Sequence, residues 1–157
     1  MKAIANDKQY YISKDGKVLN VKTNKYLSTR LNKRGYVLVD IKGKPQYLHR
    51  LLASAYLGDV HCKQVDHIDK DKQNNNLDNL RICTRSQNRA NSYKRAGANT
   101  SKYKGVSWHK AAKKWHARCY LNNKCYHVGY FLKELDASRA YNEYAGRLHG
   151  NYAVLNA

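Results

Sequence analysis

The sequence predicts an α+β fold made of N-terminal β-hairpins, a loop-rich middle segment and a C-terminal three-stranded antiparallel sheet packed on one helix. Short apolar runs alternate with turn-forming residues over residues 9–48 and 103–131. Apolar side chains recur at helical spacing over residues 48–57 and 135–148. With 157 residues, of which 42% are hydrophobic, the chain can bury one medium core or two small ones.

Residues 1–47 are predicted to form two β-hairpins that contact DNA. Turn signals separate the apolar runs at four places, Lys14-Asp15-Gly16, Thr23-Asn24, Lys33-Arg34-Gly35 and Lys42-Gly43-Lys44-Pro45. The strands and turns carry basic side chains at Lys17, Lys22, Lys25, Arg30, Lys33, Arg34, Lys42 and Lys44. A basic β-ribbon fits the width of the major groove. A solvated sheet face would show the same pattern, so the spacing leaves both interpretations open.

The middle of the chain begins with a predicted helix and continues as a predicted loop. In LHRLLASAYL, residues 48–57, apolar residues follow helical spacing, and Gly58 supplies a stop. Residues 65–91 contain six Asn and four Asp, a density that favours a loop held by side-chain hydrogen bonds. Residues 93–101 are polar, basic and without periodicity, and they form the predicted linker.

Residues 102–157 are predicted to form the C-terminal domain. Strand-like runs occupy residues 103–108, 115–121 and 125–131, and a helical pattern follows at residues 135–148. In the middle run, alternation predicts a core face of Trp115, Ala117, Cys119 and Leu121, and a ligand face of His116, Arg118, Tyr120 and Asn122. Trp115 and Tyr141 are expected in the core, whereas Trp108 could either pack or contact DNA.

The charge of the chain points to a polyanionic partner. Lys and Arg number 30 against 11 acidic residues, giving a formal charge of +19. Both parts are basic, with 20 Lys and Arg against 8 acids in residues 1–98 and 10 against 3 in residues 99–157. No run is long enough for a membrane span, and the first residues lack a signal-peptide core. We therefore expect an intracellular protein with reduced cysteines and no membrane contact.

The strongest chemical signal lies in residues 65–88, VDHIDKDKQNNNLDNLRICTRSQN. Hydrolysis of a phosphodiester needs a base that activates water and a divalent cation that stabilises the developing charge. His67 can be the base, and the neighbouring Asp66 can be a hard oxygen ligand. One Asp plus one Asn carbonyl would leave most of the coordination shell to water and phosphate oxygens, as Mg²⁺ prefers.

The pattern VDHIDKDKQNN, followed by NLR and a later Asn, resembles the HNH endonuclease family in its homing and phage-type branch. The resemblance implies a ββα-metal nuclease core over residues 48–92. It also implies that Asp66 and Asn88 bind the metal ion, Mg²⁺ or alternatively Mn²⁺. His67 would be the general base, and Asn79 would hold its imidazole by a hydrogen bond.

Residues around this motif receive lesser roles. Three arginines are predicted to contact DNA phosphates, Arg50, Arg81 and Arg85, with solvated side chains as the alternative. His49 is expected to be structural rather than catalytic, and Asn74, Asn75 and Asn76 are expected to brace the loop. The family commonly has Gly-Asn after its His-Ile-Asp, where this chain has Lys70 and Asp71, so the loop turn departs from the pattern.

A second resemblance covers residues 101–156. The runs SKYKGVSW, KKWHARCYL, HVGYF, SRAYNEYAGRLHG and NYAVLN together resemble an Apetala-2-like, ethylene-response-factor type DNA-binding domain. That family places its three-stranded sheet in the major groove with the helix behind. The resemblance implies a groove face of Lys104, Gly105, Ser107, His109, Arg118, Tyr120 and His127. Ser107 and His109 replace family arginines, so the plant base specificity does not transfer.

Together these features and resemblances predict a metal-dependent, site-specific endonuclease that acts on double-stranded DNA, and they imply no protein partner. One active site per chain suggests a monomer that nicks one strand, or a double-strand cutter only if the protein dimerises or acts twice. A DNA-binding protein with a silent HNH loop is one alternative, and it would bind DNA without needing His67. A non-specific or RNA-directed nuclease is another, and it should not need residues 101–156.

Overall fold

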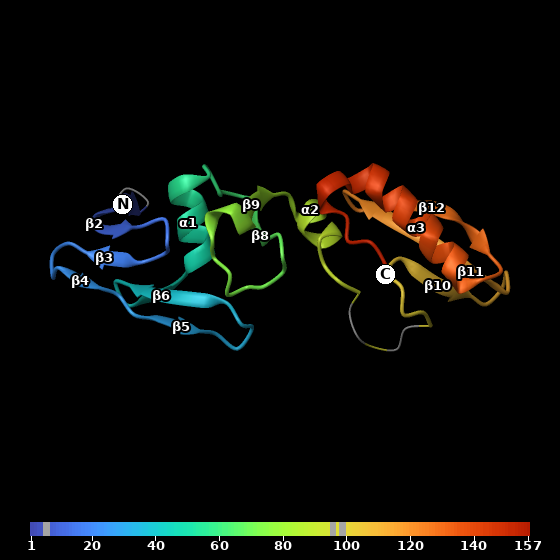
Figure 1. Cartoon of the computed structure of the whole chain (residues 1–157), viewed down its shortest axis with the longest axis horizontal. Coiled ribbons are helices and arrows are strands. Elements are labelled where there is room, and N and C mark those ends of the chain that lie inside the picture. Colours follow the sequence, from blue (N-terminus) through green and yellow to red (C-terminus); the bar gives the residue numbers. More distant parts are fainter. Residues whose placement is uncertain (5–6, 95–96, 98–99) are drawn as a thin grey trace. The chain divides into compact units, whose positions relative to one another are not determined.

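The computed structural model describes residues 1–4, 7–94, 97 and 100–157, and it divides into two compact units (Figure 1). Unit 1 is Met1–Thr84 and unit 2 is Arg85–Ala157. Small antiparallel sheets and a few helices build both, which confirms the predicted α+β fold. The division falls before the predicted linker at residues 93–101, of which residues 95, 96, 98 and 99 lie outside the described residues.

Unit 1 begins with two antiparallel sheets where two hairpins were predicted. The first contains four strands in chain order, β1 (Lys2–Ile4), β2 (Asp7–Ile12), β3 (Val18–Asn20) and β4 (Lys25–Tyr26). The second contains three, β5 (Thr29–Leu31), β6 (Val37–Ile41) and β7 (Lys44–Tyr47). Arg30, from the predicted basic ribbon, forms an exposed two-pronged ion pair with Asp40, with both N–O distances 3.1 Å.

Helix α1 (Leu48–Tyr56) supplies the centre of the core of unit 1. Leu52 and Ala53 are fully buried and pack with Ile12, Val18 and Val39 from the two sheets. The helix therefore forms where the apolar spacing predicted it, because its buried side is needed to cover both sheets.

The segment after α1 contains more regular structure than its Asn and Asp content suggested. Strand β8 (Gln64–His67) pairs antiparallel with β9 (Leu80–Cys83), and a short 3₁₀ helix, η1 (Leu77–Asn79), precedes β9. Val65 and Leu80 are buried in the core of unit 1, so burial favours the two strands. The predicted loop is thus confined to the polar residues between them.

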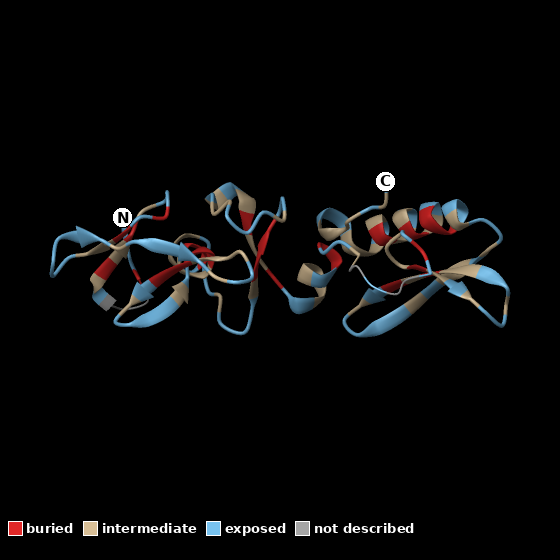
Figure 2. Ribbon diagram, turned by 90° about the horizontal axis from the view of Figure 1, so that it is seen from below, coloured by how far each residue is buried: buried red, intermediate tan, exposed pale blue. Residues whose placement is uncertain are grey.

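Unit 2 contains the predicted three-stranded sheet and helix. Its elements are α2 (Arg85–Ala90), β10 (Val106–His109), β11 (Lys114–Leu121), β12 (Lys124–Phe131), α3 (Glu134–His149) and η2 (Gly150–Tyr152). The sheet is antiparallel in the order β10-β11-β12. One side of α3 carries buried residues (Figure 2), and Ala137, Tyr141 and Ala145 pack there against Ala117 and Cys119.

Two composition-based expectations concern the whole chain. Cys62, Cys83, Cys119 and Cys125 form no disulfide in the structure; the first and last are exposed and the other two are buried. Among the described residues, no helix has the length and apolar character needed to cross a membrane.

Candidate active site

The β8–β9 hairpin positions the two residues that carry the predicted chemistry. Asp66 and His67 end β8, and the register pairs them with Arg81 and Leu80 of β9. Although adjacent strand residues point to opposite faces, both side chains are buried, with 7% of Asp66 and 5% of His67 exposed. Packing on both sides therefore fixes their directions.

Asp66 is held by a buried ion pair. Arg81 donates from Nε to Asp66 Oδ2 at 2.9 Å, and its Nη2 lies 2.9 Å from the same oxygen. The side chains are 7% and 16% exposed. The cross-strand register places the Arg81 guanidinium beside this carboxylate, and a phosphate contact by Arg81 stays a prediction.

His67 is surrounded by aromatic rings and one amide. Its Nε2 lies 3.1 Å from Oδ1 of Asn75. The ring centroid of His49 is 5.0 Å away and that of Tyr36 is 6.2 Å away. Sequence reasoning missed Tyr36, because no pattern links the second sheet to this motif, and it assigned Asn75 only to loop bracing.

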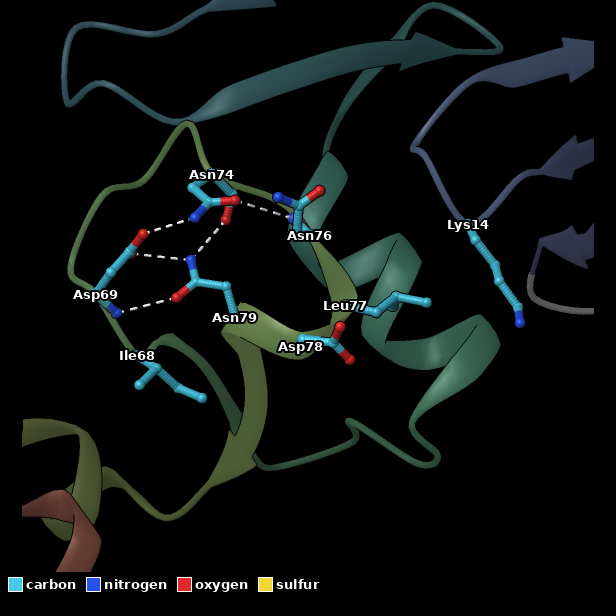
Figure 3. Close-up of a pocket in the computed structure, with 8 residues that line it drawn as sticks. All are labelled: Lys14, Ile68, Asp69, Asn74, Asn76, Leu77, Asp78 and Asn79. Atoms are coloured by element: carbon cyan, nitrogen blue, oxygen red, sulfur yellow. Dashed lines mark hydrogen bonds between the residues drawn. The ribbon is translucent and has the colours of Figure 1, made fainter.

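Asn79 holds the loop (Figure 3). Its Oδ1 accepts a hydrogen bond from the backbone N–H of Asp69 at 3.0 Å, and its Nδ2 donates to Asp69 Oδ1 at 2.9 Å and to the Asn74 carbonyl at 2.8 Å. The side-chain hydrogen bond from Asn74, followed by that from Asn79, lowers the pKa of Asp69. All three contacts go to Asp69 and Asn74, and the role of Asn79 at His67 stays a prediction.

An open cavity of about 690 Å³ lies beside this loop network. Lys14, Ile68, Asp69, Asn74, Asn76, Leu77, Asp78 and Asn79 line it (Figure 3). Asp66 and His67 are not among the lining residues. The cavity is therefore separate from the predicted catalytic pair.

His49 packs against His67 from the start of α1. It is 6% exposed, and its Nδ1 has no hydrogen-bond partner among the described residues. Burial, with smaller contributions from the charges of His67 and Arg50, lowers the pKa of His49 to about 4. His49 is therefore neutral near pH 7, as a buried packing residue would be.

Arg50 braces a backbone turn. Its guanidinium donates to the carbonyls of Lys63 at 3.1 Å and Val60 at 3.0 Å. These contacts tie α1 to the segment that leads into β8, and a phosphate contact by Arg50 stays a prediction.

The departure from the family pattern at Lys70 has a backbone consequence. Lys70 has φ = +70°, in the left-handed region that favours glycine. Its N–H donates to the His67 carbonyl at 3.0 Å, so it closes the turn directly after β8. A side chain at this position costs about 1–2 kcal/mol compared with glycine.

The remaining predicted residues of the nuclease motif lie in unit 2. Arg85 begins α2 and is exposed, and Asn88 lies on the same helix and is half-buried. Asp66, His67 and Asn79 belong to unit 1. Asn88 as a metal ligand stays a prediction.

The exposed face of the sheet in unit 2 carries a histidine cluster, which we define as His109, His116, His127 and Tyr130. His116 Nε2 lies 2.5 Å from His127 Nδ1. The Tyr130 ring lies 4.7–5.1 Å from all three imidazoles, measured between centroids. Burial, and then the charges of Arg118, His127 and His109, lower the pKa of His116.

Other predicted groove residues divide between this face and the interior. Arg118 donates to Ser107 Oγ at 3.3 Å, and Tyr120 is exposed. Lys104 instead donates its ammonium protons to the carbonyls of Ala90 at 2.5 Å and Ser92 at 2.6 Å. It therefore ties residues 90 and 92 to the segment that leads into β10, and its predicted place in the groove stays a prediction.

Gly105 is a packing residue. It has φ = +74°, and a Cβ built there would lie 2.2 Å from the Tyr141 ring and 2.7 Å from the Arg118 carbonyl oxygen. A glycine is thus required here because Tyr141 of α3 approaches closely, and the groove contact of Gly105 stays a prediction. Trp108 is 38% exposed and meets Trp115 edge-on, with ring centroids 5.2 Å apart.

Comparison with known proteins identifies a nuclease family that is consistent with the fold and with the buried Asp66–His67 pair. Residues 46–90 match the model of the HNH endonuclease family. This segment includes α1, the β8–β9 hairpin and α2.

Particular relatives extend the similarity. The chain is 41% identical over 90 residues to the uncharacterized HNH endonuclease L245 of Acanthamoeba polyphaga mimivirus, which covers 54% of this chain and 27% of that protein. It is 37% identical over 95 residues to the H-N-H endonuclease F-TflII of Escherichia phage T5, covering 56% and 49%. It is 34% identical over 103 residues to the DNA endonuclease I-HmuI of Bacillus phage SP01, covering 62% and 59%.

A solved structure is also similar. The structure described as "DNA binding and cleavage by the HNH homing endonuclease I-HmuI" superposes with a TM-score of 0.52 at 33% sequence identity. The match covers 57% of this chain and 55% of that chain. The chain thus spans between about a quarter and three fifths of the length of these three curated relatives.

Proposed function

We propose that the chain is a metal-dependent DNA endonuclease of the HNH homing type, which hydrolyses a phosphodiester bond in double-stranded DNA and nicks one strand as a monomer. The observation that carries the proposal is the buried Asp66–His67 pair on β8, inside the segment that matches the HNH endonuclease family. Relatives named as DNA endonuclease or homing endonuclease support it.

His67 is proposed as the general base that accepts a proton from the attacking water. A neutral imidazole carries one N–H and one lone pair, so a base must keep its lone pair directed at the water. The packing of His49 and Tyr36 around the ring limits its rotation. His67 is thus held in one orientation before DNA arrives, which lowers the entropy lost at the reaction step.

The donors in the motif fit a hard divalent cation. Asp66 offers a carboxylate and Asn88 an amide oxygen, which suit Mg²⁺ or Mn²⁺. When bound, such a cation stabilises the charge that develops on the phosphate and leaving oxygen. The Arg81 guanidinium, 2.9 Å from Asp66 Oδ2, holds the carboxylate in place.

The DNA contacts are proposed to come from both units. Residues 79–133 contain 13 Lys and Arg and no acidic residue, so the sheet of unit 2 lies in a strongly basic stretch. On its exposed face, Arg118, Tyr120 and the histidine cluster offer cationic and aromatic groups. We propose that this Apetala-2-like face enters a groove of the duplex, as the three-stranded sheet of that family does.

Plasmid cleavage tests the proposal. Supercoiled plasmids that carry candidate sites would be incubated with the protein and with His67→Ala, each with Mg²⁺ and with EDTA. Discrete nicked circles that need both the cation and His67 are expected. Cleavage that persists in EDTA, or equal cleavage by His67→Ala, would contradict the proposed roles.

One observation favours a second candidate, a DNA-binding protein with a silent HNH loop. The buried Arg81 guanidinium already neutralises the carboxylate that would hold the cation. If this second candidate is right, the protein binds duplex DNA in a gel shift, and neither the native protein nor any variant cleaves it. The same plasmid experiment therefore separates the two candidates.

A further inference from the structure

We propose that Asn75 is the positioning residue of His67 and that it selects which ring nitrogen carries the proton. Asn75 Oδ1 lies 3.1 Å from His67 Nε2, and Asn75 lies eight positions beyond His67, in the loop that follows β8. The catalytic consequence of this inference rests on the proposed nuclease function. The structural consequence, a single tautomer, does not.

A second hydrogen bond fixes the orientation of the Asn75 amide. Its Nδ2 donates to the Gln73 carbonyl at 3.1 Å, and a carbonyl can only accept. The amide oxygen must therefore face His67. An amide oxygen only accepts, so Nε2 of His67 carries the hydrogen in this pair.

The tautomer of His67 follows from this contact. In a neutral imidazole one nitrogen is protonated and the other bears the lone pair. With the proton on Nε2, the lone pair is on Nδ1, which becomes the nitrogen able to accept a proton. An imidazole in the opposite tautomer would present an N–H there and could not act as a base.

The loop is built to hold Asn75 in this place. The Asn75 N–H donates to Gln73 O at 3.0 Å, and the Gln73 N–H donates to Asp71 Oδ1 at 2.9 Å. Asn79 anchors the preceding residue through the carbonyl of Asn74. Asn79 therefore acts on His67 through the loop, and Asn75 makes the contact.

The direct test is the tautomer of His67 measured by NMR. The full chain would be labelled with ¹⁵N histidine and studied at pH 8, where ordinary imidazoles are neutral. Two-bond ¹H–¹⁵N correlations distinguish a protonated from an unprotonated ring nitrogen, and the spectrum of His67→Gln assigns the signal. The native protein should show the Nε2–H form.

Variants at Asn75 separate the role of the oxygen from that of bulk. Asn75→Asp keeps an acceptor and should keep the Nε2–H form. Asn75→Leu has a similar volume and no acceptor, and it should shift His67 to a mixture of the two tautomers. Asn75→Ala carries the same test should Leu prevent folding, and Asn76→Leu at the neighbouring exposed position is the control that should leave the signal unchanged.

Kinetics add the functional readout. In a nuclease, Asn75→Leu should lower kcat by about 10²-fold or more, the range of general-base effects, with KM for DNA nearly unchanged and Asn75→Asp retaining more activity. An unaltered Nε2–H signal in both Asn75→Leu and Asn75→Ala would overturn the inference. Because the NMR measurement needs no substrate, it tests Asn75 even where the native protein cuts no DNA.

Discussion

Replacing Arg81 with Leu is expected to lower the free energy of unfolding of unit 1 by about 3–5 kcal/mol, the usual cost of removing one partner from a buried ion pair. Asp66 is 7% exposed and Arg81 16%, with two nitrogens 2.9 Å from one carboxylate oxygen. The substitution leaves the Asp66 carboxylate buried beside a leucine. The loss is a large fraction of the 5–15 kcal/mol that stabilises an ordinary domain.

Unit 1 contains its own control for this substitution. Arg30 makes the same kind of two-pronged pair with Asp40, with N–O distances of 3.1 Å, but about half of each side chain is exposed. Solvent screens such pairs, so Arg30→Leu should leave the urea midpoint almost unchanged. Both variants remove an arginine that pairs with an aspartate through Nε and Nη2, and the two pairs differ in burial.

Urea unfolding followed at the amide resonances of unit 1 measures the effect. With a slope of about 1 kcal/mol per molar urea, the midpoint of Arg81→Leu should fall by about 3 M or more. The double variant Asp66→Leu/Arg81→Leu should recover much of the loss, because no buried charge is left without its partner. Equal midpoints for Arg81→Leu and Arg30→Leu would refute the reasoning.

Three further outcomes are expected. Burial lowers the pKa of His49 to about 4, compared with about 6.5 in an unfolded chain, so protonation favours unfolding. The free energy of unfolding of unit 1 should therefore fall by up to about 3 kcal/mol between pH 6.5 and pH 4. Urea titrations should show a smaller fall for His49→Phe. Gly105→Ala should destabilise unit 2 by several kcal/mol in thermal melts, about 1–3 kcal/mol more than Gly150→Ala. Gly150 also has positive φ, but no atom lies within 4 Å of a Cβ added there. Equal losses for the two variants would disprove the packing argument. Burial lowers the pKa of His116, and a nearby phosphate would raise it. DNA affinity should therefore increase as the pH falls from 8 to 6, by about tenfold per pH unit for each proton taken up. Gel shifts at constant ionic strength should show a weaker dependence of affinity on pH for His116→Gln/His127→Gln.

The elements predicted best from the sequence are those in which one regular spacing of apolar residues runs through the whole element. The helix expected at residues 135–148 is α3, Glu134–His149, because its apolar spacing and its packing on the sheet agree. The first strand of that sheet starts at Val106, later than the expected residue 103, because Gly105 takes positive φ and the Val106 N–H turns back to the Tyr103 carbonyl.

The sequence pointed to the residues of the candidate site, whose roles stay predictions, but not to the contacts that these residues make. The spacing pointed to Asp66 and His67, and both occupy one buried strand. Which of several asparagines meets the imidazole depends on the path of the loop, so Asn75 could not be chosen over Asn79. The Asp66–Arg81 pair depends on cross-strand register, which a 15-residue separation in sequence does not reveal.

The placement of the two tryptophans gives this chain an optical reporter that is confined to unit 2. Trp108 and Trp115 are its two tryptophans, and both lie in the sheet of unit 2, in edge-to-face contact. Excitation at the red edge of the absorption band therefore reports on unit 2 alone, whereas unit 1 emits only through its tyrosines. Quenching or a wavelength shift on adding DNA would isolate the events at the C-terminal sheet, and the unfolding of unit 2 could be recorded in the intact chain without an added label.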